Sequence, residues 1–278
     1  MPTAAGAFPA RSYLFVPADR PERVAKARAS GADAVIVDLE DAVAPDAKAA
    51  AREAVGKVLD PGAPVLIRIN GPKTPWFRED LAFCTRPGVA GVVLPKTESV
   101  DDVRAVAEAV GGEMPILPLV ETARGIRDAE AIAQTGCVER LLFGALDLQL
   151  DLGIGGEGEE LNYFRSMLVL ASRLAGIASP VDGVTTALDD PAALRADALR
   201  ARRFGFGGKL CIHPKQVAIV NECFTPSAEE VAWARRVLQA VRGAPHAVVA
   251  VDGRMVDRPV VMRAEAILRA VGEAEVGG

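Results

Sequence analysis

Short apolar runs alternate with segments of helical periodicity along most of the chain. The runs hold Val, Ile and Leu at consecutive positions rather than at every second one, a pattern typical of parallel strands buried on both faces. We predict strands at Tyr13–Pro17, Ala34–Leu39, Val65–Ile69, Gly91–Leu94, Ile116–Val120, Arg140–Gly144, Ala178–Val181 and Gly208–Ile212. The alternation favours an α/β fold, a TIM (β/α)8 barrel, with an open doubly wound sheet as the alternative.

The chain continues well beyond the last predicted strand. Ser227-x-x-Glu230 has the spacing of a capping box, which marks the start of another helix. Residues 243–259 are predicted to form a linker, and helical periodicity returns from 260 to 271. We therefore expect a barrel catalytic domain at residues 1–224. Residues 225–278 are expected to form a C-terminal helical extension or lid that reaches a neighbouring subunit.

The composition indicates a protein with a large core. Of 278 residues, 50% are apolar and 25% are charged, and the net charge of −5 argues against nucleic-acid binding. No apolar run reaches the roughly 18 residues that a membrane span needs. Residues 1–10 lack the basic start and apolar run of a signal peptide, and the four cysteines lack C-x-x-C spacing. We expect a cytoplasmic protein with neither membrane nor nucleic-acid partners.

Polar residues gather where the predicted strands end. In a TIM barrel the carboxyl ends of the strands form one rim, and the catalytic side chains meet there. The residues at or just after these ends are Arg20, Asp38, Glu40, Asp41, Arg68, Asn70, Lys96, Glu121, Asp147, Asp182 and His213. We expect the acids after the second strand to orient Arg68, Lys96 or metal-bound water, and we leave His213 out of the catalytic set.

Glu121 and Asp147 are the candidate metal ligands of this rim. Each follows an apolar run that we expect to form a strand ending at the acid. A carboxylate in that position is costly unless its charge is compensated. Because no Cys or His lies nearby in the sequence, the oxygen ligands favour a hard cation such as Mg²⁺. The alternative is that both acids form ion pairs with Lys96 or Arg124.

Two glycine-rich segments have different predicted roles. Gly153–Gly158 is an acidic loop after the sixth strand and is predicted to be a mobile flap over the site. It lacks the G-K-[ST] ending of a phosphate-binding loop. Gly205–Gly208 precedes a strand and is predicted to be a turn.

Short motifs occur in a defined order along the chain. They are Arg11–Pro17 (RSYLFVP), Asp38–Val43 (DLEDAV), Arg68–Asn70 (RIN), Leu94–Lys96 (LPK), Val120–Ala123 (VETA), Gly144–Asp147 (GALD) and Gly208–Pro214 (GKLCIHP). Over roughly residues 11–260 the sequence resembles the citrate lyase β-subunit / malyl-CoA lyase family of CoA ester lyases. The resemblance implies a TIM barrel that makes or breaks a carbon–carbon bond in a 3-hydroxyacyl thioester with Mg²⁺. It also implies a homotrimer or a dimer of trimers.

The resemblance also assigns roles around the metal and the oxo acid. Glu121 and Asp147 resemble the two Mg²⁺ ligands. Arg68 resembles the arginine that clamps the carboxylate of the oxo acid. Ala145 and Leu146, in the same motif as Asp147, belong to the implied substrate-binding set. From the residues alone, Arg68 has the alternative of a structural ion pair with Glu40 or Asp41.

Four further assignments concern coenzyme A and proton transfer. Phe15, Arg20 and Lys26 fall at the spacing of the family's CoA-contacting residues, although the two basic residues are also compatible with a solvated helix face. Asp257 resembles a tail aspartate that completes the site of a neighbouring subunit. It would protonate the acetyl-CoA enolate or take its proton in the reverse direction. A helix-capping role is the alternative for Asp257.

The leading functional hypothesis is therefore a Mg²⁺-dependent carbon–carbon lyase. It cleaves or forms a citramalyl-, malyl- or citryl-type CoA thioester, with an oxo acid and acetyl-CoA as the other partners. The alternatives are a malate-synthase or thioesterase activity on the same scaffold and an oxo-acid-binding component of a larger complex. A fourth is an aldolase that uses Lys96 as a Schiff-base nucleophile. An ammonium beside several acids stays protonated, which disfavours the last.

Overall fold

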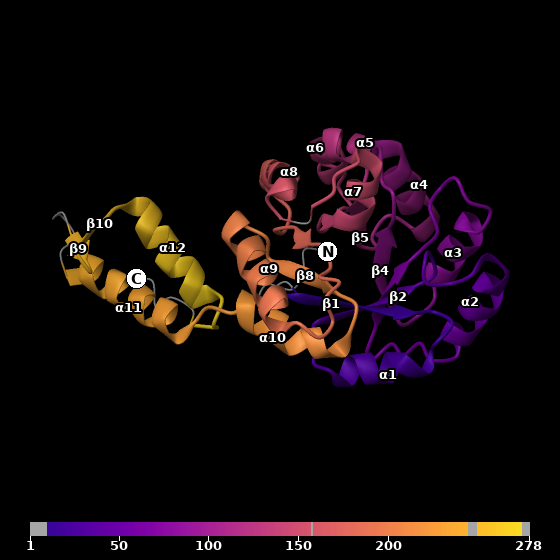
Figure 1. The fold of residues 1–278 in the computed structure, drawn as a ribbon, viewed down its shortest axis with the longest axis horizontal. Helices are drawn as coiled ribbons and strands as arrows, with labels where there is room; N and C mark the ends of the chain where they lie inside the picture. Colours follow the sequence, from indigo (N-terminus) through magenta and orange to yellow (C-terminus); the bar gives the residue numbers. More distant parts are fainter. Residues whose placement is uncertain (1–9, 157, 244–248, 274–278) are drawn as a thin grey trace. The chain divides into compact units, whose positions relative to one another are not determined.

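The computed structural model describes residues 10–156, 158–243 and 249–273 (Figure 1). The chain divides into two compact units, Met1–Asn221 and Glu222–Gly278. The division falls inside helix α10 (Pro214–Phe224), close to the boundary at 224/225 expected from the sequence. The roles expected for the two parts remain predictions.

The first unit is a closed barrel of parallel strands in the order β1 to β8 (Figure 1). The strands are β1 Ser12–Pro17, β2 Ala34–Asp38, β3 Val65–Arg68, β4 Val89–Leu94, β5 Ile116–Val120, β6 Leu142–Phe143, β7 Val181–Asp182 and β8 Gly208–Cys211. The last strand pairs with the first, with Ser12 opposite Lys209. This closure excludes the open doubly wound sheet and confirms the predicted TIM-type barrel.

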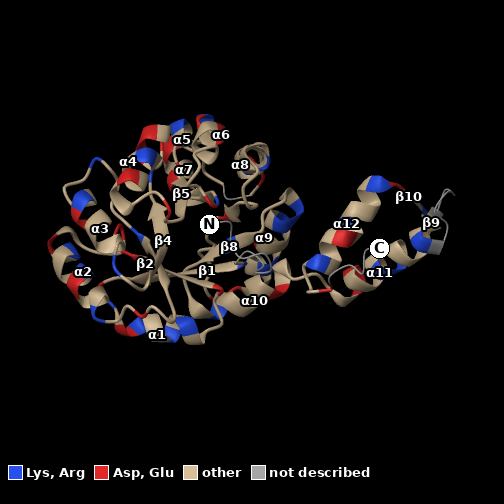
Figure 2. Cartoon of the chain, turned by 180° about the vertical axis from the view of Figure 1, so that it is seen from behind, with Lys and Arg blue, Asp and Glu red and all other residues tan. Residues whose placement is uncertain are grey.

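The helices of this unit lie outside the strands, as Figure 1 shows. They are α1 Glu22–Ala29, α2 Lys48–Gly56, α3 Phe77–Cys84, α4 Val100–Val110, α5 Ala123–Arg127, α6 Ala129–Ala133, α7 Ala145–Leu152, α8 Asn162–Ala175, α9 Pro191–Phe204 and α10, with short 3-10 turns η1 Pro45–Ala47 and η2 Glu159–Leu161. Acidic and basic residues are interspersed over these helices (Figure 2). Among the described residues, no helix combines the length and the apolar character that crossing a membrane requires.

Two strands, the sixth and the seventh, are shorter than their apolar runs predict by more than one residue. We expected a strand over Arg140–Gly144, but β6 keeps only Leu142 and Phe143. The buried Arg140 side chain occupies the amino-terminal end of the barrel, where its guanidinium donates to the carbonyls of Ala10 and Ser179. The seventh strand likewise begins at Val181 rather than three residues earlier.

One layer of the barrel interior takes apolar residues from every strand. Its buried members are Tyr13, Ile36, Leu66, Val93, Leu117, Leu119, Leu142, Val181 and Leu210. These side chains fill the barrel, as is usual for an eight-stranded closed sheet. The layer therefore forms a rigid floor beneath the carboxyl ends of the strands.

The second unit contains two helices and a short hairpin. Its elements are α11 Ala228–Gly243, β9 Val249–Val251, β10 Arg254–Val256 and α12 Arg258–Arg269. The predicted capping box is confirmed, because Ser227 and Glu230 exchange backbone-to-side-chain hydrogen bonds of 2.8 and 3.1 Å. The linker prediction is wrong where the hairpin forms. Its turn residues Asp252 and Gly253 both have positive φ, as an Asp-Gly hairpin turn requires.

Candidate active site

A cavity of about 310 Å³ opens at the carboxyl ends of the barrel strands. Strands β1, β2, β3, β5, β6 and β8 and the segments that follow β2, β5, β6, β7 and β8 line it. The cavity brings together six of the predicted site residues, namely Phe15, Arg68, Glu121, Ala145, Leu146 and Asp147. They come from distant parts of the chain and meet because parallel strands carry their carboxyl ends to one rim.

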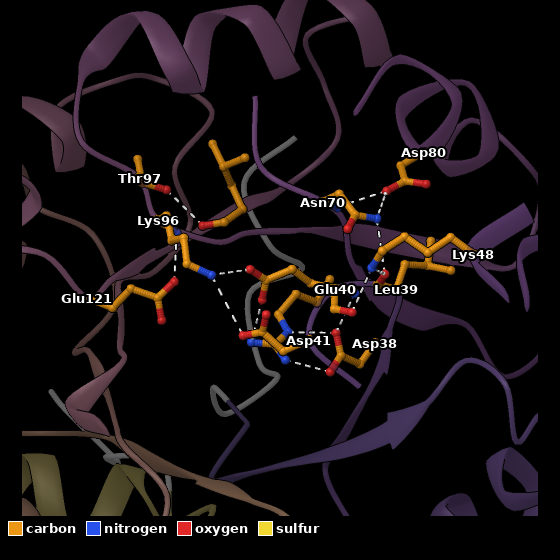
Figure 3. Close-up of polar contacts among 12 residues, drawn as sticks. Asp38, Leu39, Glu40, Asp41, Lys48, Asn70, Asp80, Lys96, Thr97 and Glu121 are labelled. Carbon is orange, nitrogen blue, oxygen red and sulfur yellow. Dashed lines mark hydrogen bonds and ion pairs between the residues drawn. The ribbon is translucent and has the colours of Figure 1, made fainter. Parts of the chain in front are cut away.

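Glu121 lies directly after β5 and is 1% exposed. The backbone N–H of Lys96 donates to its Oε1 atom at 2.7 Å (Figure 3). Lys96 has a φ of 49°, a left-handed conformation that is strained for a residue with a Cβ. Gly144 passes so close that an added Cβ would lie 2.3 Å from Glu121 Oε2. The backbone N–H of Lys96 and the close approach of Gly144 thus fix the position of the Glu121 carboxylate.

Burial and the charge of Asp147 raise the pKa of Glu121 to about 8, although the hydrogen bond from Lys96 opposes the shift. A buried carboxyl group whose ionisation is opposed by a neighbouring carboxylate is a suitable ligand for a divalent cation. Among the described residues, no cluster of three or more His, Cys, Asp or Glu side chains is placed to hold a metal. Mg²⁺ requires only one or two carboxylates, because water and substrate complete its coordination. The residue pair therefore fits the predicted ion.

Binding of Mg²⁺ at pH 7 is expected to release close to one proton. In the metal-free protein a carboxyl group with a pKa of about 8 is mostly protonated at that pH, and it must ionise to bind the metal. Titration calorimetry in buffers of different ionisation enthalpy measures the proton count, which should fall towards zero above pH 9. A count near zero already at pH 7 would show that Glu121 is ionised in the metal-free protein.

Asp147 lies in a helix and not at a strand end, so the predicted position is wrong. The strand ends at Phe143, and Asp147 lies in the first turn of α7. Gly144 makes this change of direction directly beside Glu121. A carboxylate in the first turn of a helix is stabilised by the helix dipole. The half-buried Asp147 nevertheless reaches the cavity that Glu121 lines.

Arg68 is held by two acids, Asp38 at the end of β2 and Glu40 just after it. Its Nε and one terminal nitrogen donate to the two oxygens of Asp38 at 2.7 and 2.5 Å, and its other terminal nitrogen lies 3.0 Å from Glu40. Burial disfavours the charged guanidinium, but these two acids raise its pKa above the ordinary value. Its guanidinium carbon lies 4.9 Å from the ring centroid of Phe15. Arg68 therefore forms the alternative ion pair and also lines the cavity.

The Lys96 ammonium pairs with Glu40 and, at 3.7 Å, with Asp41. Partial burial disfavours its charge, but the hydrogen bond to Glu40 and the charge of Glu40 raise the pKa of Lys96. A lysine held protonated in this way is a poor Schiff-base nucleophile. The hydrogen bond between Lys96 and Glu121 is made by the backbone N–H of Lys96, while its ammonium faces Glu40.

Sequence reasoning missed the buried polar residues that support the β2–α2 segment. The Lys48 ammonium donates to the carbonyls of Leu39 and Glu40, both at 2.8 Å. Asp80 accepts from the side chain of Asn70 at 2.6 Å (Figure 3). It also accepts from the guanidinium of Arg52 at 2.7 Å. These bonds hold the loop that carries Glu40. Lys48 lies at the start of an ordinary amphipathic helix, so no local pattern predicted its burial.

The remaining predicted residues lie outside the lining of this cavity. Arg20 and Lys26 are exposed, in the turn after β1 and on α1. Asp257 lies in the second unit, where it caps α12 by accepting a 3.1 Å hydrogen bond from Val260 N. The alternatives of a solvated face and a helix cap match these positions, and the proposed CoA and proton-transfer roles stay predictions. His213 Nδ1 accepts from the backbone of Lys215 at 3.1 Å, at the start of α10.

The profile of the HpcH/HpaI aldolase/citrate lyase family matches residues 11–214. The chain belongs to this family. It is 41% identical over 276 residues to a citrate lyase subunit beta-like protein of Deinococcus radiodurans, covering 93% of this chain and 96% of the relative. The family membership confirms the resemblance seen in the motifs and identifies the chain as an enzyme of the CoA ester lyase type.

Two further relatives from Cereibacter sphaeroides carry named activities. A (3S)-malyl-CoA thioesterase is 36% identical over 277 residues, covering 94% of this chain and 96% of the relative. An L-malyl-CoA/beta-methylmalyl-CoA lyase is 36% identical over 303 residues, covering 95% of each. Among solved structures, CitE of Mycobacterium tuberculosis in complex with magnesium, acetoacetate and coenzyme A superposes with a TM-score of 0.85. It is 39% identical and covers 96% of this chain and 100% of that one.

Proposed function

We propose that this family member is a Mg²⁺-dependent lyase that cleaves or forms a 3-hydroxyacyl-CoA thioester of the malyl, citramalyl or citryl type. One observation carries the proposal. Glu121, Asp147 and Arg68 line a single cavity, so a metal pair and a carboxylate-binding cation lie within reach of one small ligand. The complex of CitE with magnesium, acetoacetate and coenzyme A supports the same ligand classes here.

Arg68 is proposed to orient the oxo acid. Asp38 occupies one side of its guanidinium and Glu40 contacts one terminal nitrogen, so the plane of the group is set before a ligand arrives. Both terminal nitrogens retain a further N–H, and a pair of such donors matches a carboxylate. Preorganisation of this kind reduces the entropy lost on binding.

Glu121 and Asp147 are proposed to hold Mg²⁺, with the Lys96 amide and the α7 dipole keeping their carboxylates in position. When bound, the ion acts as a Lewis acid on the oxygen that is a hydroxyl in the thioester and a keto group in the oxo acid. In the cleavage direction this hydroxyl gives its proton to solvent water, the electrons of the O–H bond form the keto group, and the carbon–carbon bond breaks so that the acetyl fragment leaves as an enolate. Asp257 from a neighbouring subunit is proposed to protonate that enolate.

The CoA moiety is proposed to lie along the β1–α1 side of the site. Phe15 of β1 lines the cavity beside Arg68, while Arg20 and Lys26 are exposed farther along the same segment. Along this segment an apolar ring is followed by exposed cations. This order suits a ligand whose thioester lies near the ring and whose phosphate groups lie near the cations.

Release of acetyl-CoA tests the proposal. The purified chain with Mg²⁺ is incubated with malyl-, citramalyl- and citryl-CoA, and acetyl-CoA is measured by chromatography. Cleavage that EDTA abolishes and added Mg²⁺ restores is the expected result. If no acetyl-CoA appears from any of the three thioesters, the lyase assignment is wrong.

A thioesterase is the second candidate, favoured by the (3S)-malyl-CoA thioesterase among the relatives. Hydrolysis would release free CoA thiol and the intact hydroxy acid, whereas cleavage releases acetyl-CoA and an oxo acid. Following both thiol and acetyl-CoA in the same reaction separates the two outcomes.

Asp257→Asn is expected to lower kcat by about 10²- to 10⁴-fold without changing the melting temperature. Asparagine is as good a helix cap as aspartate, so the α12 cap is retained while the proton donor is lost. Steady-state kinetics and a thermal melt make the comparison. An Asn variant with unimpaired kcat would assign Asp257 to capping alone.

Mixing subunits tests where Asp257 acts and whether the chain forms the proposed homotrimer. Asp257→Asn protomers have intact metal ligands, and Glu121→Gln protomers have an intact tail. If the tail serves a neighbour, mixed oligomers of these two inactive variants regain activity. No recovery in co-expressed, co-purified mixtures would show that the tail acts on its own barrel or not at all. Light scattering on the parent protein gives the mass of the assembly.

A further inference from the structure

We infer that Asp41 accepts the proton of the substrate's 3-hydroxyl group in the cleavage direction, passes it to solvent water, and returns it in the condensation direction. The inference rests on the proposed function and deepens it, because no residue has yet been given to this proton. It comes from the titratable groups that line the 310 Å³ cavity and from a second cavity beside it.

The 310 Å³ cavity contains few groups that could accept a proton. Its acids are Asp38, Asp41, Glu121 and Asp147, and among the described residues that line the cavity Arg68 is the single cation. No His, Lys, Cys or Tyr side chain contributes to the described lining. A general base must lie within hydrogen-bond reach of the proton that it removes, directly or through one water molecule. The acceptor must therefore be one of the four acids.

Three of the four acids are already engaged. Both oxygens of Asp38 accept from Arg68, at 2.7 and 2.5 Å, and one of them also accepts from a backbone N–H at 2.9 Å. Glu121 and Asp147 are the proposed metal ligands, and a carboxylate must stay ionised to hold a metal ion. The remaining acid is Asp41, whose side chain is 61% exposed.

Asp41 is held in place by a cation that leaves its oxygens available. The Lys96 ammonium lies 3.7 Å from Asp41 and also pairs with Glu40 (Figure 3). A separation of 3.7 Å is that of an ion pair and is too long for a hydrogen bond. The carboxylate is therefore restrained by charge, while its lone pairs remain free to accept a proton.

The second cavity, of about 600 Å³, gives Asp41 a route to solvent. Polar side chains such as Asn70, Thr74 and Thr122 line it, together with Lys73, whose side chain is 84% exposed. Among the described residues that line the two cavities, Asp41 alone belongs to both. A carboxylate at this boundary can take a proton from the substrate on one side and release it to water on the other.

The proton and the electrons of the cleavage step are then all accounted for. The 3-hydroxyl proton passes to a carboxylate oxygen of Asp41, and the electron pair of the O–H bond becomes the second bond of the keto group. The electron pair of the broken carbon–carbon bond remains on the acetyl fragment as the enolate, which Asp257 is proposed to protonate. Asp41 returns to its ionised form when its proton moves to water in the second cavity.

Removing the carboxylate and then replacing it from solution tests the inference. Asp41→Ala is expected to lower kcat for cleavage by about 10²- to 10⁴-fold, the range that a general base contributes. Added formate, a carboxylate small enough for the space left by the side chain, should raise the kcat of this variant by at least about tenfold. Acetyl-CoA release is measured at increasing formate concentration with Mg²⁺ and the thioester that the parent protein cleaves best.

Asp46→Ala is the matched control, because Asp46 is an exposed acid of the same segment and lines neither cavity. It should keep the parent kcat at every formate concentration. An Asp41→Ala variant with a kcat within about threefold of the parent would overturn the inference while leaving the lyase assignment intact. A loss that formate does not relieve would also overturn it, since an external carboxylate replaces a base but not a structural contact.

Binding measurements separate the loss of a base from the loss of the site. Calorimetry on Asp41→Ala should show Mg²⁺ and pyruvate bound at least as tightly as by the parent, because Glu121, Asp147 and Arg68 are all retained. Affinities weakened more than about tenfold would show that Asp41 supports the site and does not transfer the proton. If the parent itself releases no acetyl-CoA, the lyase proposal fails and this inference fails with it.

Discussion

Replacing Glu121 by glutamine is expected to abolish Mg²⁺ binding at millimolar concentrations and to lower turnover by at least about 10³-fold. Two carboxylates form the proposed metal site, and the amide removes the charge of the one that is 1% exposed. Asp147→Asn should produce the same losses. Calorimetric titration with Mg²⁺ and the acetyl-CoA assay measure them, with Glu108→Gln on the surface of α4 as the control.

Although Glu121→Gln is expected to abolish metal binding, it should stabilise the metal-free fold at high pH. The pKa of Glu121 is raised to about 8 in the folded state, so its contribution to stability is greatest in acid and is lost as the pH rises through 8. Glutamine has no charge to bury, so in EDTA above pH 8 the variant should melt at a higher temperature than the parent. Loss of activity together with a lower melting temperature at every pH would instead indicate misfolding. If the variant retains metal binding and turnover, Glu121 is not a metal ligand.

Arg68→Lys is expected to lower kcat/KM by about 10²- to 10³-fold, because a lysine cannot offer the paired donors of a guanidinium. Charged hydrogen bonds of this kind are worth roughly 1.5–3 kcal/mol each. The loss should appear mainly in the KM for the oxo acid if Arg68 binds the ground state. It should appear in kcat if alignment is its main contribution.

The Arg68 substitution also affects the neighbouring acids. Lysine keeps the positive charge beside Asp38 and Glu40, so the fold should survive with a modest fall in melting temperature, whereas Arg68→Met would leave both acids without that partner. Arg104→Lys on the exposed face of α4 provides the control. If Arg68→Lys keeps the parent kcat/KM, the residue is a structural ion-pair partner only.

The strands and the position of Glu121 were predictable because their signals are local. Consecutive Val, Ile and Leu residues mark strands buried on both faces, and Glu121 directly follows such a run. Asp147 was predicted in the right cavity but on the wrong element. Leu141–Leu146 is apolar throughout, and an apolar run of that length does not reveal where a strand turns into a helix.

Other features depend on contacts between residues far apart in the chain. The ring of Phe15, predicted only as a CoA contact, stacks on the guanidinium of Arg68. Asp38 and not Asp41 is the bidentate partner of Arg68, although both acids belong to the same short motif. The choice depends on the register of the adjacent strands β2 and β3, which places Asp38 opposite Arg68, and neither composition nor spacing contains that information.

By itself, the sequence determined that eight apolar segments alternate with helices, that acids and an arginine follow them, and that the motifs match one enzyme family. These properties follow from the residue types and their order. Only the tertiary structure decided that Lys96 adopts a left-handed backbone to bind Glu121, that burial and Asp147 raise the pKa of that glutamate, and that one cation lines the described wall. Burial, charge coupling and hydrogen-bond geometry depend on distances across the barrel, and closure of the sheet sets those distances.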